Sequence, residues 1–335
     1  MSERTFIRDM QPAQYIEGIF AIQNCQLGQT KTGKPYIKCL LADRSGRTPG
    51  RMWNATEELY QSLPTNGFVW LEGQTQPYQG EMQVIINRIR SHEPTEQELK
   101  DLLPVTQYNV DEMFAEVIRI LQTMENPAIK SICDRYFEDG QLMDLFCKAP
   151  AATTLHHAYL GGLLEHTLSL LKLADRIMPL YPELNRDIML LGLFLHDLGK
   201  CCELNWDTGF SYSEDGMLIG HIARGVVILE EKVRACREMN IAIPDPTLRV
   251  LQHIILSHHG QLEFGAAKLP ATPEAIAISI LDNLDAKMNM ALAATRDENG
   301  DRQGDLGGNF TEKIWALGTR LYRPDPTKLS QEHES

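Results

Sequence analysis

The most constraining feature of this sequence is a histidine and an aspartate side by side at the end of an apolar run. Residues 188–195 are apolar throughout, and His196, Asp197 and, three positions on, Lys200 follow them. An imidazole and a carboxylate are costly to bury in apolar surroundings unless something pairs with both. A divalent cation does so, and the stretch therefore predicts a buried helix that carries part of a metal site.

Most other histidines also lie in or beside apolar helical patterns, eight of the ten between residues 156 and 259. One histidine on such a face is usually a hydrogen-bonded core residue, but so many on successive helices favour a shared site. They supply enough ligands for two cations, bridged by Asp197, because a carboxylate has two oxygens. In chain order the candidate ligands are His166, His196, Asp197, His221, His258, His259 and Asp282.

Two positions in this set depend on local geometry. Asp282 and Asp285 lie three residues apart on one predicted helix face, so spacing alone does not choose between them. Consecutive helical residues point about 100° apart. His258 and His259 can therefore reach one ion only if the helix ends there, and Gly260 is a typical residue just beyond a helix end.

The N-terminal part of the chain has a different pattern. Apolar residues alternate over 16–22, and extended runs are predicted at 36–42, 48–53, 68–74 and 82–89, with a short helix at 56–63. This is the order of an OB-fold, a small barrel that commonly holds single-stranded nucleic acid. Lys34 would follow the backbone while Tyr36 and Trp53 stack on bases. In the alternative interpretation, Trp53 is a core residue and the lysines are a solvated rim.

From residue 110 onwards the apolar spacing is helical, with helices predicted at 161–177, 186–198, 220–239, 247–257, 273–294 and 310–321. No strand-like alternation competes with them. We therefore expect a multidomain chain in which an all-β OB-fold barrel precedes an all-α domain. The expected bounds are 1–95 for the barrel, 96–110 for a linker, 111–325 for the α domain and 326–335 for a frayed tail.

Charge and composition agree with this division. The chain has a net charge of -13, yet residues 1–92 hold ten Lys and Arg against eight Asp and Glu. The acidity therefore lies in the α domain, where metal ions can supply the positive charge that phosphates need. No apolar run reaches the roughly 18–20 residues of a membrane span, and no leader pattern precedes the barrel. With seven cysteines and no CxxC, reduced thiols and a cytoplasmic protein without membrane contact are expected.

The histidine and aspartate pattern resembles a known superfamily. His166, the His196–Asp197 pair and Asp282 match the H…HD…D pattern of the HD metal-dependent phosphohydrolases, and the remaining histidines match its two-metal branch. With the barrel, the segments 156–167 (HHAYLGGLLEHT) and 282–287 (DNLDAK) make the whole chain resemble the YhaM family of 3'-to-5' exoribonucleases.

The resemblance implies a specific chemistry. Residues 111–325 would be the HD domain, with Asp282 as its last ligand and Asp285 a lesser candidate. Mn²⁺ would be the cation, although Fe, Co, Ni or Zn suit the same ligand types. His196 and Asp197 would be catalytic, with Lys200 binding a substrate phosphate.

Further partners follow from the same interpretation. His157 and Arg224 are predicted as additional phosphate contacts. The partner would be single-stranded RNA or DNA, hydrolysed from the 3' end by a water activated between two metal ions. The sequence does not decide whether the chain forms a homo-oligomer.

Two other functions remain open at this stage. An HD-type enzyme could hydrolyse cyclic dinucleotides or free nucleotides, although Lys287-Met288-Asn289-Met290 stands where the cyclic-dinucleotide branch has an Arg-Pro motif. The chain could also be a non-catalytic nucleic-acid-binding protein with a structural metal site, which would bind RNA or DNA without turnover.

Overall fold

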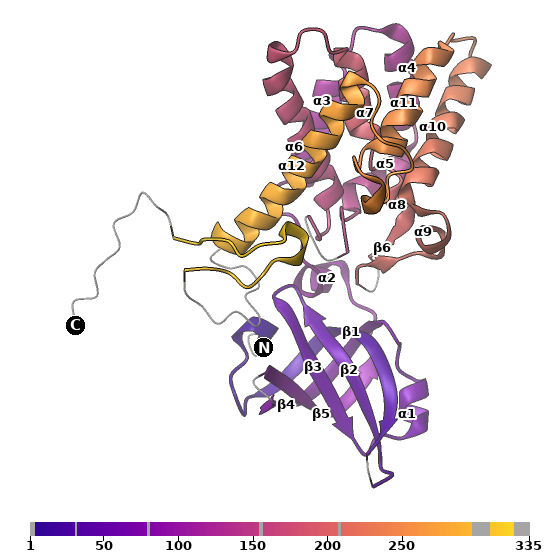
Figure 1. The fold of residues 1–335 in the computed structure, drawn as a ribbon. Coiled ribbons are helices and arrows are strands. Elements are labelled where there is room, and N and C mark those ends of the chain that lie inside the picture. The colour runs from indigo at the N-terminus through magenta and orange to yellow at the C-terminus, as the bar shows by residue number, and fades with distance from the viewer. Residues whose placement is uncertain are drawn as a thin grey trace.

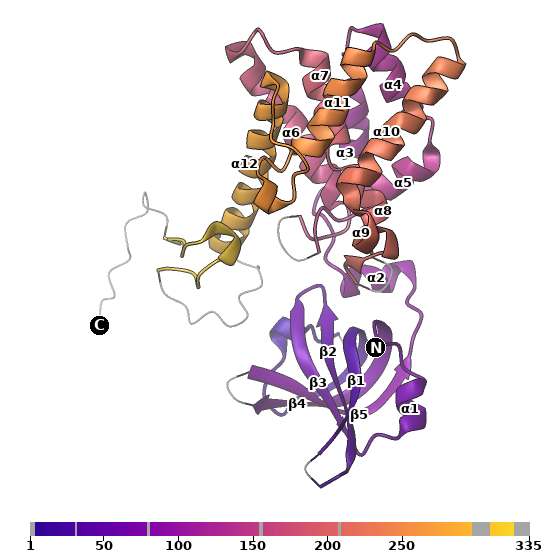
Figure 2. The same ribbon diagram turned by 45° about the vertical axis from the view of Figure 1, so that its right-hand side comes forward.

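The computed structural model describes residues 4–30, 32–78, 81–153, 157–206, 209–296 and 309–324. The β-barrel lies below the helical domain in Figures 1 and 2, with helix α2 (Glu96–Leu102) between them. None of the helices in these residues has the length and apolar character to cross a membrane. The predicted frayed tail, 326–335, lies outside the described residues.

The barrel has the strand order of an OB-fold. Its strands β1–β5 close in the order β1-β2-β3-β5-β4, β4 pairing back to β1 and β3 running parallel to β5. Helix α1 (Glu57–Gln61) lies between β3 and β4, and the Thr56 hydroxyl accepts a hydrogen bond from the Leu59 amide in its first turn. The predicted order of three strands, a helix and two strands is confirmed. The strands are β1 (Tyr15–Gln29), β2 (Pro35–Asp43), β3 (Gly46–Trp53), β4 (Gly67–Tyr78) and β5 (Glu81–Ser91), preceded by the 3₁₀ turn η1 (Ile7–Asp9).

Alternation along the strands fills the barrel interior. Phe20 and Ile22 of β1 are buried, as are Ile37 and Leu41 of β2 and Leu71 of β4. Because successive strand residues point to opposite faces, these strands leave their other side chains on the outside. The apolar and polar alternation in the sequence therefore fixes which side chains can meet a ligand.

The segment predicted as a linker contains helix α2 (Glu96–Leu102). A capping box starts it: the Thr95 hydroxyl accepts from the Glu98 amide, and the Glu98 carboxylate accepts from the Thr95 amide at 2.7 Å. Helix α2 is not a free linker, because its apolar face packs on the barrel. We call the resulting cluster the interdomain core; it comprises Ala21, Ala42, Phe68, Leu102 and Leu103, with Ile19, Leu99, Leu160 and Phe210 packed against it.

The helical domain forms one large core around helix α7 (Arg186–Leu195). The Asn185 side chain caps α7, and every residue from Asp187 to Leu195 is buried. The other elements are α3 (Val110–Leu121), α4 (Pro127–Phe137), α5 (Gly140–Lys148), α6 (Gly162–Ile177), η2 (Met178–Leu180), α8 (Lys200–Glu203), β6 (Leu204–Asn205), β7 (Ser211–Tyr212), α9 (Glu214–Leu218), α10 (Gly220–Glu238), α11 (Asp245–Ser257), η3 (Leu262–Phe264) and α12 (Pro273–Arg296).

One expectation for this domain was wrong. Residues 310–321 do not form an α-helix: the 3₁₀ turn η4 (Trp315–Leu317) is flanked by the bridges Phe310–Tyr322 and Ile314–Thr319. Gly318, with φ at 69°, lets the chain reverse there. The predicted helical class of the domain is confirmed, and β6 and β7 add only a small two-stranded sheet.

Candidate metal centre

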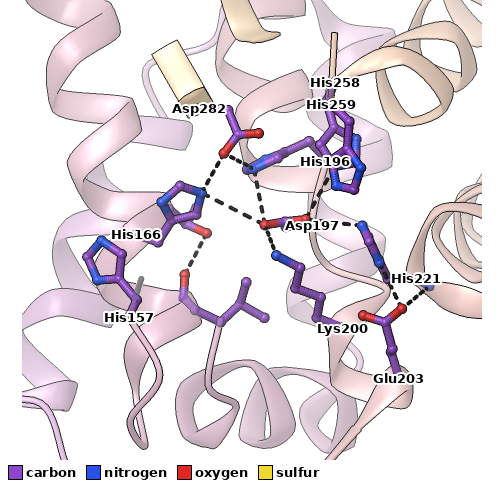
Figure 3. A network of polar contacts seen from close by, with 12 residues as sticks. His157, His166, His196, Asp197, Lys200, Glu203, His221, His258, His259 and Asp282 are labelled. Atoms are coloured by element: carbon purple, nitrogen blue, oxygen red, sulfur yellow. Dashed lines mark hydrogen bonds and ion pairs between the residues drawn. The ribbon is translucent and has the colours of Figure 1, made fainter. Parts of the chain in front are cut away.

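Side chains from five helices or helix ends of the helical domain point toward one another (Figure 3). α7 is followed directly by the His-Asp pair, so the apolar run delivers both groups to the centre of the fold. The contributing residues are His166 of α6, His196 and Asp197 after α7, His221 of α10, His258 and His259 after α11, and Asp282 of α12.

Asp197 lies at the centre of these side chains and is 2% exposed. Its Oδ1 atom is 3.5 Å from Nε2 of His221 and 3.3 Å from Nε2 of His258. Its Oδ2 atom is 3.5 Å from Nε2 of His196 and 3.8 Å from Nε2 of His166. The two oxygens of one carboxylate therefore face two different sets of imidazoles.

These contacts define two ligand groups that share Asp197. Within each group one ligand atom per residue lies within 4.8 Å of all the others. That spacing allows one cation to be held by all members of a group. The first group is His166, His196, Asp197 and Asp282, and the second is Asp197, His221, His258 and His259.

The imidazoles are held with Nε2 toward Asp197 by hydrogen bonds at their other nitrogen. Nδ1 of His196 is 2.7 Å from the Leu193 carbonyl, and Nδ1 of His258 is 2.8 Å from the Ile255 carbonyl. A carbonyl can only accept, so Nδ1 carries the proton in both rings. Such partners fix the tautomer and orientation that a metal ligand needs.

The donor set fits a cation. Four buried atoms of the site have no hydrogen-bond partner among the described residues: Nε2 of His196, His221 and His258, and Oδ1 of Asp197. Leaving one such group unsatisfied costs about 1–3 kcal/mol, so four such atoms in the two groups around Asp197 call for bound cations. Neutral imidazole nitrogens and a carboxylate are what a transition-metal or zinc ion accepts.

The structure separates Asp282 from Asp285, which spacing alone left open. Oδ1 of Asp282 is 3.2 Å from Nε2 of His166 and 3.9 Å from Nε2 of His196, inside the first ligand group. Asp285 lies on the other side of the same ring, its Oδ2 accepting from Nδ1 of His166 at 2.7 Å. The geometry favours Asp282 as the ligand and gives Asp285 the role of orienting His166.

His258 and His259 can face the same group because α11 ends at Ser257. Gly260 follows with φ at 75°, a conformation that favours glycine. Nδ1 of His259 is 2.7 Å from the Phe264 carbonyl, which leaves its Nε2 for the site. Burial and neighbouring His258 lower the pKa of His259 to about 4, so this ring is neutral near pH 7, as a ligand must be.

The electrostatics of the cluster centre on the Asp197 carboxylate. Burial works against its charge, but Lys200 and His196 hold the pKa of Asp197 well below its usual value. Burial lowers the pKa of His196 to about 4. His166 behaves differently: burial opposes its charge, yet hydrogen bonds to Asp282 and Asp285 raise its pKa to about 9. A cation in the first group would take the place of that proton.

Lys200 is buried, and its Nζ is 2.6 Å from Oδ2 of Asp197. Burial opposes its charge, but Asp197 raises its pKa, so the ammonium stays charged beside the ligand groups. The predicted phosphate contact therefore lies at the site but is engaged with Asp197 in this structure.

A close backbone approach brings His221 to Asp197. A Cβ atom added at Gly199 would lie 2.1 Å from the His221 carbonyl oxygen and 2.9 Å from the Gly225 amide nitrogen. Only glycine permits this contact between the start of α8 and the first turns of α10. Glu203, at the end of α8, then accepts from Nδ1 of His221 at 2.9 Å.

Two predicted phosphate contacts do not face the ligand groups. His157 is 3% exposed, and its ring nitrogens lie 2.8 Å from the Tyr159 hydroxyl and 2.9 Å from Asp285. Arg224 is held by Asp215 through two of its nitrogens. Both side chains have partners outside the two ligand groups, and their predicted phosphate contacts stay predictions.

Lys34, Tyr36 and Trp53 lie on the barrel, away from the ligand groups. Tyr36 of β2 is paired directly with Trp53 of β3, and their ring centroids are 5.3 Å apart. Trp53 is 43% exposed and Lys34 is also exposed. Trp53 is therefore not a core residue, and the two rings form an accessible aromatic pair of the kind that stacks on bases. Two residues before Trp53 in β3, the Arg51 guanidinium lies over the ring of Tyr78, 5.1 Å from its centroid.

The sequence interpretation missed Glu203 and the side chains behind His166. Glu203 lies six positions after Asp197. In the sequence it cannot be distinguished from other acidic residues near helix ends, because its contact with His221 depends on the packing of α10 on α8. Tyr159 and Glu165 were passed over in the same way, although both lie in the segment that carries the family resemblance.

Comparison with known proteins agrees with this architecture. The HD domain family model matches residues 163–287. Among solved structures, the second OB-fold domain of replication protein A from Methanococcus maripaludis is 13% identical and covers 28% of this chain and 98% of its own, with a TM-score of 0.23. An SSB domain from Synechococcus sp. is 17% identical and covers 24% and 96%, with a TM-score of 0.21. At such scores the OB-fold assignment rests on the strand order of the barrel itself.

One curated relative covers nearly the whole chain. The protein named 3'-5' exoribonuclease YhaM, from Geobacillus sp. (strain WCH70), is 35% identical over 305 residues, which are 90% of this chain and 90% of the relative. The match therefore includes both the barrel and the helical domain. With the HD domain model at the ligand groups, this chain belongs to the YhaM family of 3'-5' exoribonucleases.

Proposed function

We propose that this protein is a metal-dependent 3'-to-5' exoribonuclease that hydrolyses phosphodiester bonds of single-stranded RNA, with single-stranded DNA as the alternative strand to be tested. The observation that carries the proposal is the shared carboxylate of Asp197, which faces two groups of metal ligands in a chain of this family. The barrel, with its exposed aromatic pair, supports a single-stranded substrate.

Two divalent cations would be held by the two ligand groups, with Asp197 between them. When bound, they supply the positive charge that polarises a phosphodiester and lets water attack at neutral pH. The family resemblance favours Mn²⁺, while the mixed imidazole and carboxylate donors also suit Fe, Co, Ni or Zn.

The protein's own groups have distinct tasks in this proposal. The buried imidazoles of His196 and His258 are held through Nδ1 and keep their Nε2 atoms aimed at the two oxygens of Asp197 without reorganisation. Lys200 donates to Asp197 at 2.6 Å and would exchange this contact for a phosphate oxygen when RNA enters. The barrel would hold the strand upstream of the 3' end.

The alternative substrates are less well supported. A phosphodiesterase for cyclic dinucleotides or a phosphohydrolase for free nucleotides has no evident use for an attached OB-fold with exposed aromatic rings. A non-catalytic binding protein would not need two metal-ligand groups that share the Asp197 carboxylate. The relative that matches nine tenths of the chain is named as an exoribonuclease.

The proposed activity predicts a specific digestion pattern. Purified protein given 5'-labelled single-stranded RNA and Mn²⁺ should shorten it stepwise from the 3' end, and a chelator should stop the reaction. The same assay on single-stranded DNA and with Mg²⁺ gives the substrate and metal preference. Intact RNA alongside hydrolysis of a cyclic dinucleotide or a nucleotide would overturn the proposal.

The barrel surface leads to a second prediction. Trp53→Ala should weaken binding of long single-stranded RNA, because a stacked base is worth about 1–3 kcal/mol, or roughly 5-fold to 150-fold in Kd. Fluorescence anisotropy with chelator present keeps the RNA intact during the measurement. Tyr15→Ala is the matched control, since Tyr15 is an exposed barrel tyrosine beside Glu17 and Glu72. Equal losses for both variants would rule out a specific role for the aromatic pair.

The location in the cell and the oligomeric state also remain proposals. All seven cysteines are free thiols, which suits a reducing compartment, and we place the protein in the cytoplasm. A homo-oligomer stays a prediction.

A further inference from the structure

A chain of polar contacts runs from His166 outward to the segment that joins the two domains. Behind His166, one oxygen of Asp285 accepts from two imidazoles: Oδ2 is 2.7 Å from Nδ1 of His166 and 2.9 Å from Nε2 of His157. The bond from Asp285 to Nδ1 fixes the orientation of the His166 ring, and therefore also the direction in which its Nε2 atom faces the first ligand group.

The contacts continue beyond His157. Its Nδ1 is 2.8 Å from the Tyr159 hydroxyl, and that hydroxyl donates to Oε1 of Glu165 at 2.8 Å. The Tyr159 hydroxyl has one proton to donate and lone pairs that can accept, so it can contact both groups at once. The polar contacts are therefore continuous from Glu165 through Tyr159 and His157 to Asp285.

The far end lies in the segment between α2 and α3. The Thr106 hydroxyl donates to Oε2 of Glu165 at 2.5 Å. The Thr106 backbone amide also donates to the Leu160 carbonyl at 2.9 Å. Thr106 thus ties the segment to α6 through its side chain and to the loop that carries His157 and Tyr159 through its backbone.

Backbone geometry holds the same loop in place. His157 has φ at 48°, which a non-glycine residue rarely adopts, and Gly161 has φ at 79°. A Cβ atom on Gly162 would lie 2.1 Å from the His157 carbonyl oxygen. The loop therefore presses on the start of α6, one turn before His166.

We propose that Tyr159 and Glu165 are positioning residues for the metal ligand His166. They act through His157 and Asp285, and Thr106 extends their reach to the interdomain segment. This inference rests on the proposed function only for its consequence in catalysis. Its direct consequence is metal affinity, because partners that orient a ligating histidine are typically worth 10-fold to 100-fold.

The test is Tyr159→Phe, which removes one hydroxyl and keeps the ring. Titration of the full-length protein with Mn²⁺ by isothermal calorimetry, without RNA, should show one site weakened. The expected loss is near the lower end of the range for a direct partner of a ligating histidine, about 10-fold, because Tyr159 acts through His157 and Asp285. The site formed with His221, His258 and His259 should keep its affinity. With excess Mn²⁺, kcat on RNA should return toward that of the unchanged protein.

A matched control separates positioning from general loss of stability. Thr167→Val removes another buried hydroxyl from α6, whose bond goes to the Leu163 carbonyl and has no link to Asp285. It should lower the unfolding temperature without changing either Mn²⁺ affinity. Thr106→Val is the second test variant if Tyr159→Phe does not fold, and it should shift the same site in the same direction.

The outcomes distinguish this inference from the proposed function. Unchanged Mn²⁺ affinity in the Tyr159 and Thr106 variants, or an equal loss in Thr167→Val, would overturn the positioning role even if the protein digests RNA. Conversely, protein that binds Mn²⁺ with the predicted dependence on Tyr159 but leaves RNA intact would overturn only the exonuclease proposal.

Discussion

Asp197→Asn should eliminate RNA digestion, lowering kcat/KM by about a thousandfold or more, because groups that merely support a ligand are already worth about 10-fold to 100-fold. Asp197 is the one residue common to both ligand groups. An asparagine offers a single carbonyl oxygen and turns an NH₂ donor toward the other set of imidazoles. Metal analysis after desalting should therefore find both ions lost.

The comparison that makes this result specific is Asp282→Asn, whose residue belongs to one group only. That variant should lose one ion and keep the other. Retention of two ions by Asp197→Asn would contradict the bridging role.

A stability artefact has to be removed from this experiment. Asp197→Asn leaves the Lys200 ammonium buried without its partner, and breaking a buried pair costs about 3–5 kcal/mol. The double variant Asp197→Asn/Lys200→Met removes the stranded charge. If it recovers the unfolding temperature and still binds neither ion, the loss belongs to the ligand set and not to unfolding.

Gly199→Ala should damage the site without touching any polar group. The added Cβ would lie 2.1 Å from the His221 carbonyl oxygen, so α8 and α10 must separate. Overpacking of this kind lowers the free energy of unfolding by about 1–3 kcal/mol, and by more when the added atom clashes with backbone. His221 should move away from Asp197, which predicts a weaker second ion and a steep fall in activity. Thermal unfolding and Mn²⁺ titration measure the two effects.

Gly140→Ala provides the control for this substitution. Gly140 begins α5 with nothing within 4 Å of an added Cβ atom. Alanine is the better helix former, so this variant should be neutral or slightly stabilised with normal metal binding. A similar loss in both variants would show that Gly199 has no special packing role.

The sequence was informative where one pattern had one physical interpretation. The alternation over 16–22 and the turns between strands predicted the barrel, and the run 188–195 predicted the buried helix that carries the His-Asp pair. It failed where a local pattern depends on distant packing. Residues 310–321 have helical apolar spacing but form bridges around Gly318. Helix α2 in the segment 96–110 was not predicted, because its apolar face can be recognised only from its packing on the barrel.

The candidate site divides in the same way. Residue types and their order in the chain predicted the side chains that the structure brings together in the two ligand groups. Spacing alone could not tell Asp282 from Asp285. Their difference lies in which nitrogen of His166 each one faces, and only the crossing of α6 and α12 determines that. The sequence also does not show that His157 is buried beside Asp285, and its predicted phosphate contact stays a prediction.

The interdomain core has a consequence for where digestion stops. Ala21 and Phe68 of the barrel share that cluster with Leu160 of the helical domain, so the barrel is mounted on the domain and not tethered by a free linker. In the proposed function, the barrel surface and Asp197 would therefore stay a fixed distance apart. A strand that spans this distance would be held at both places, whereas a shorter remnant would lose its contact with the barrel. The length of the final oligonucleotide would then follow from the architecture and not from the chemistry of the bond.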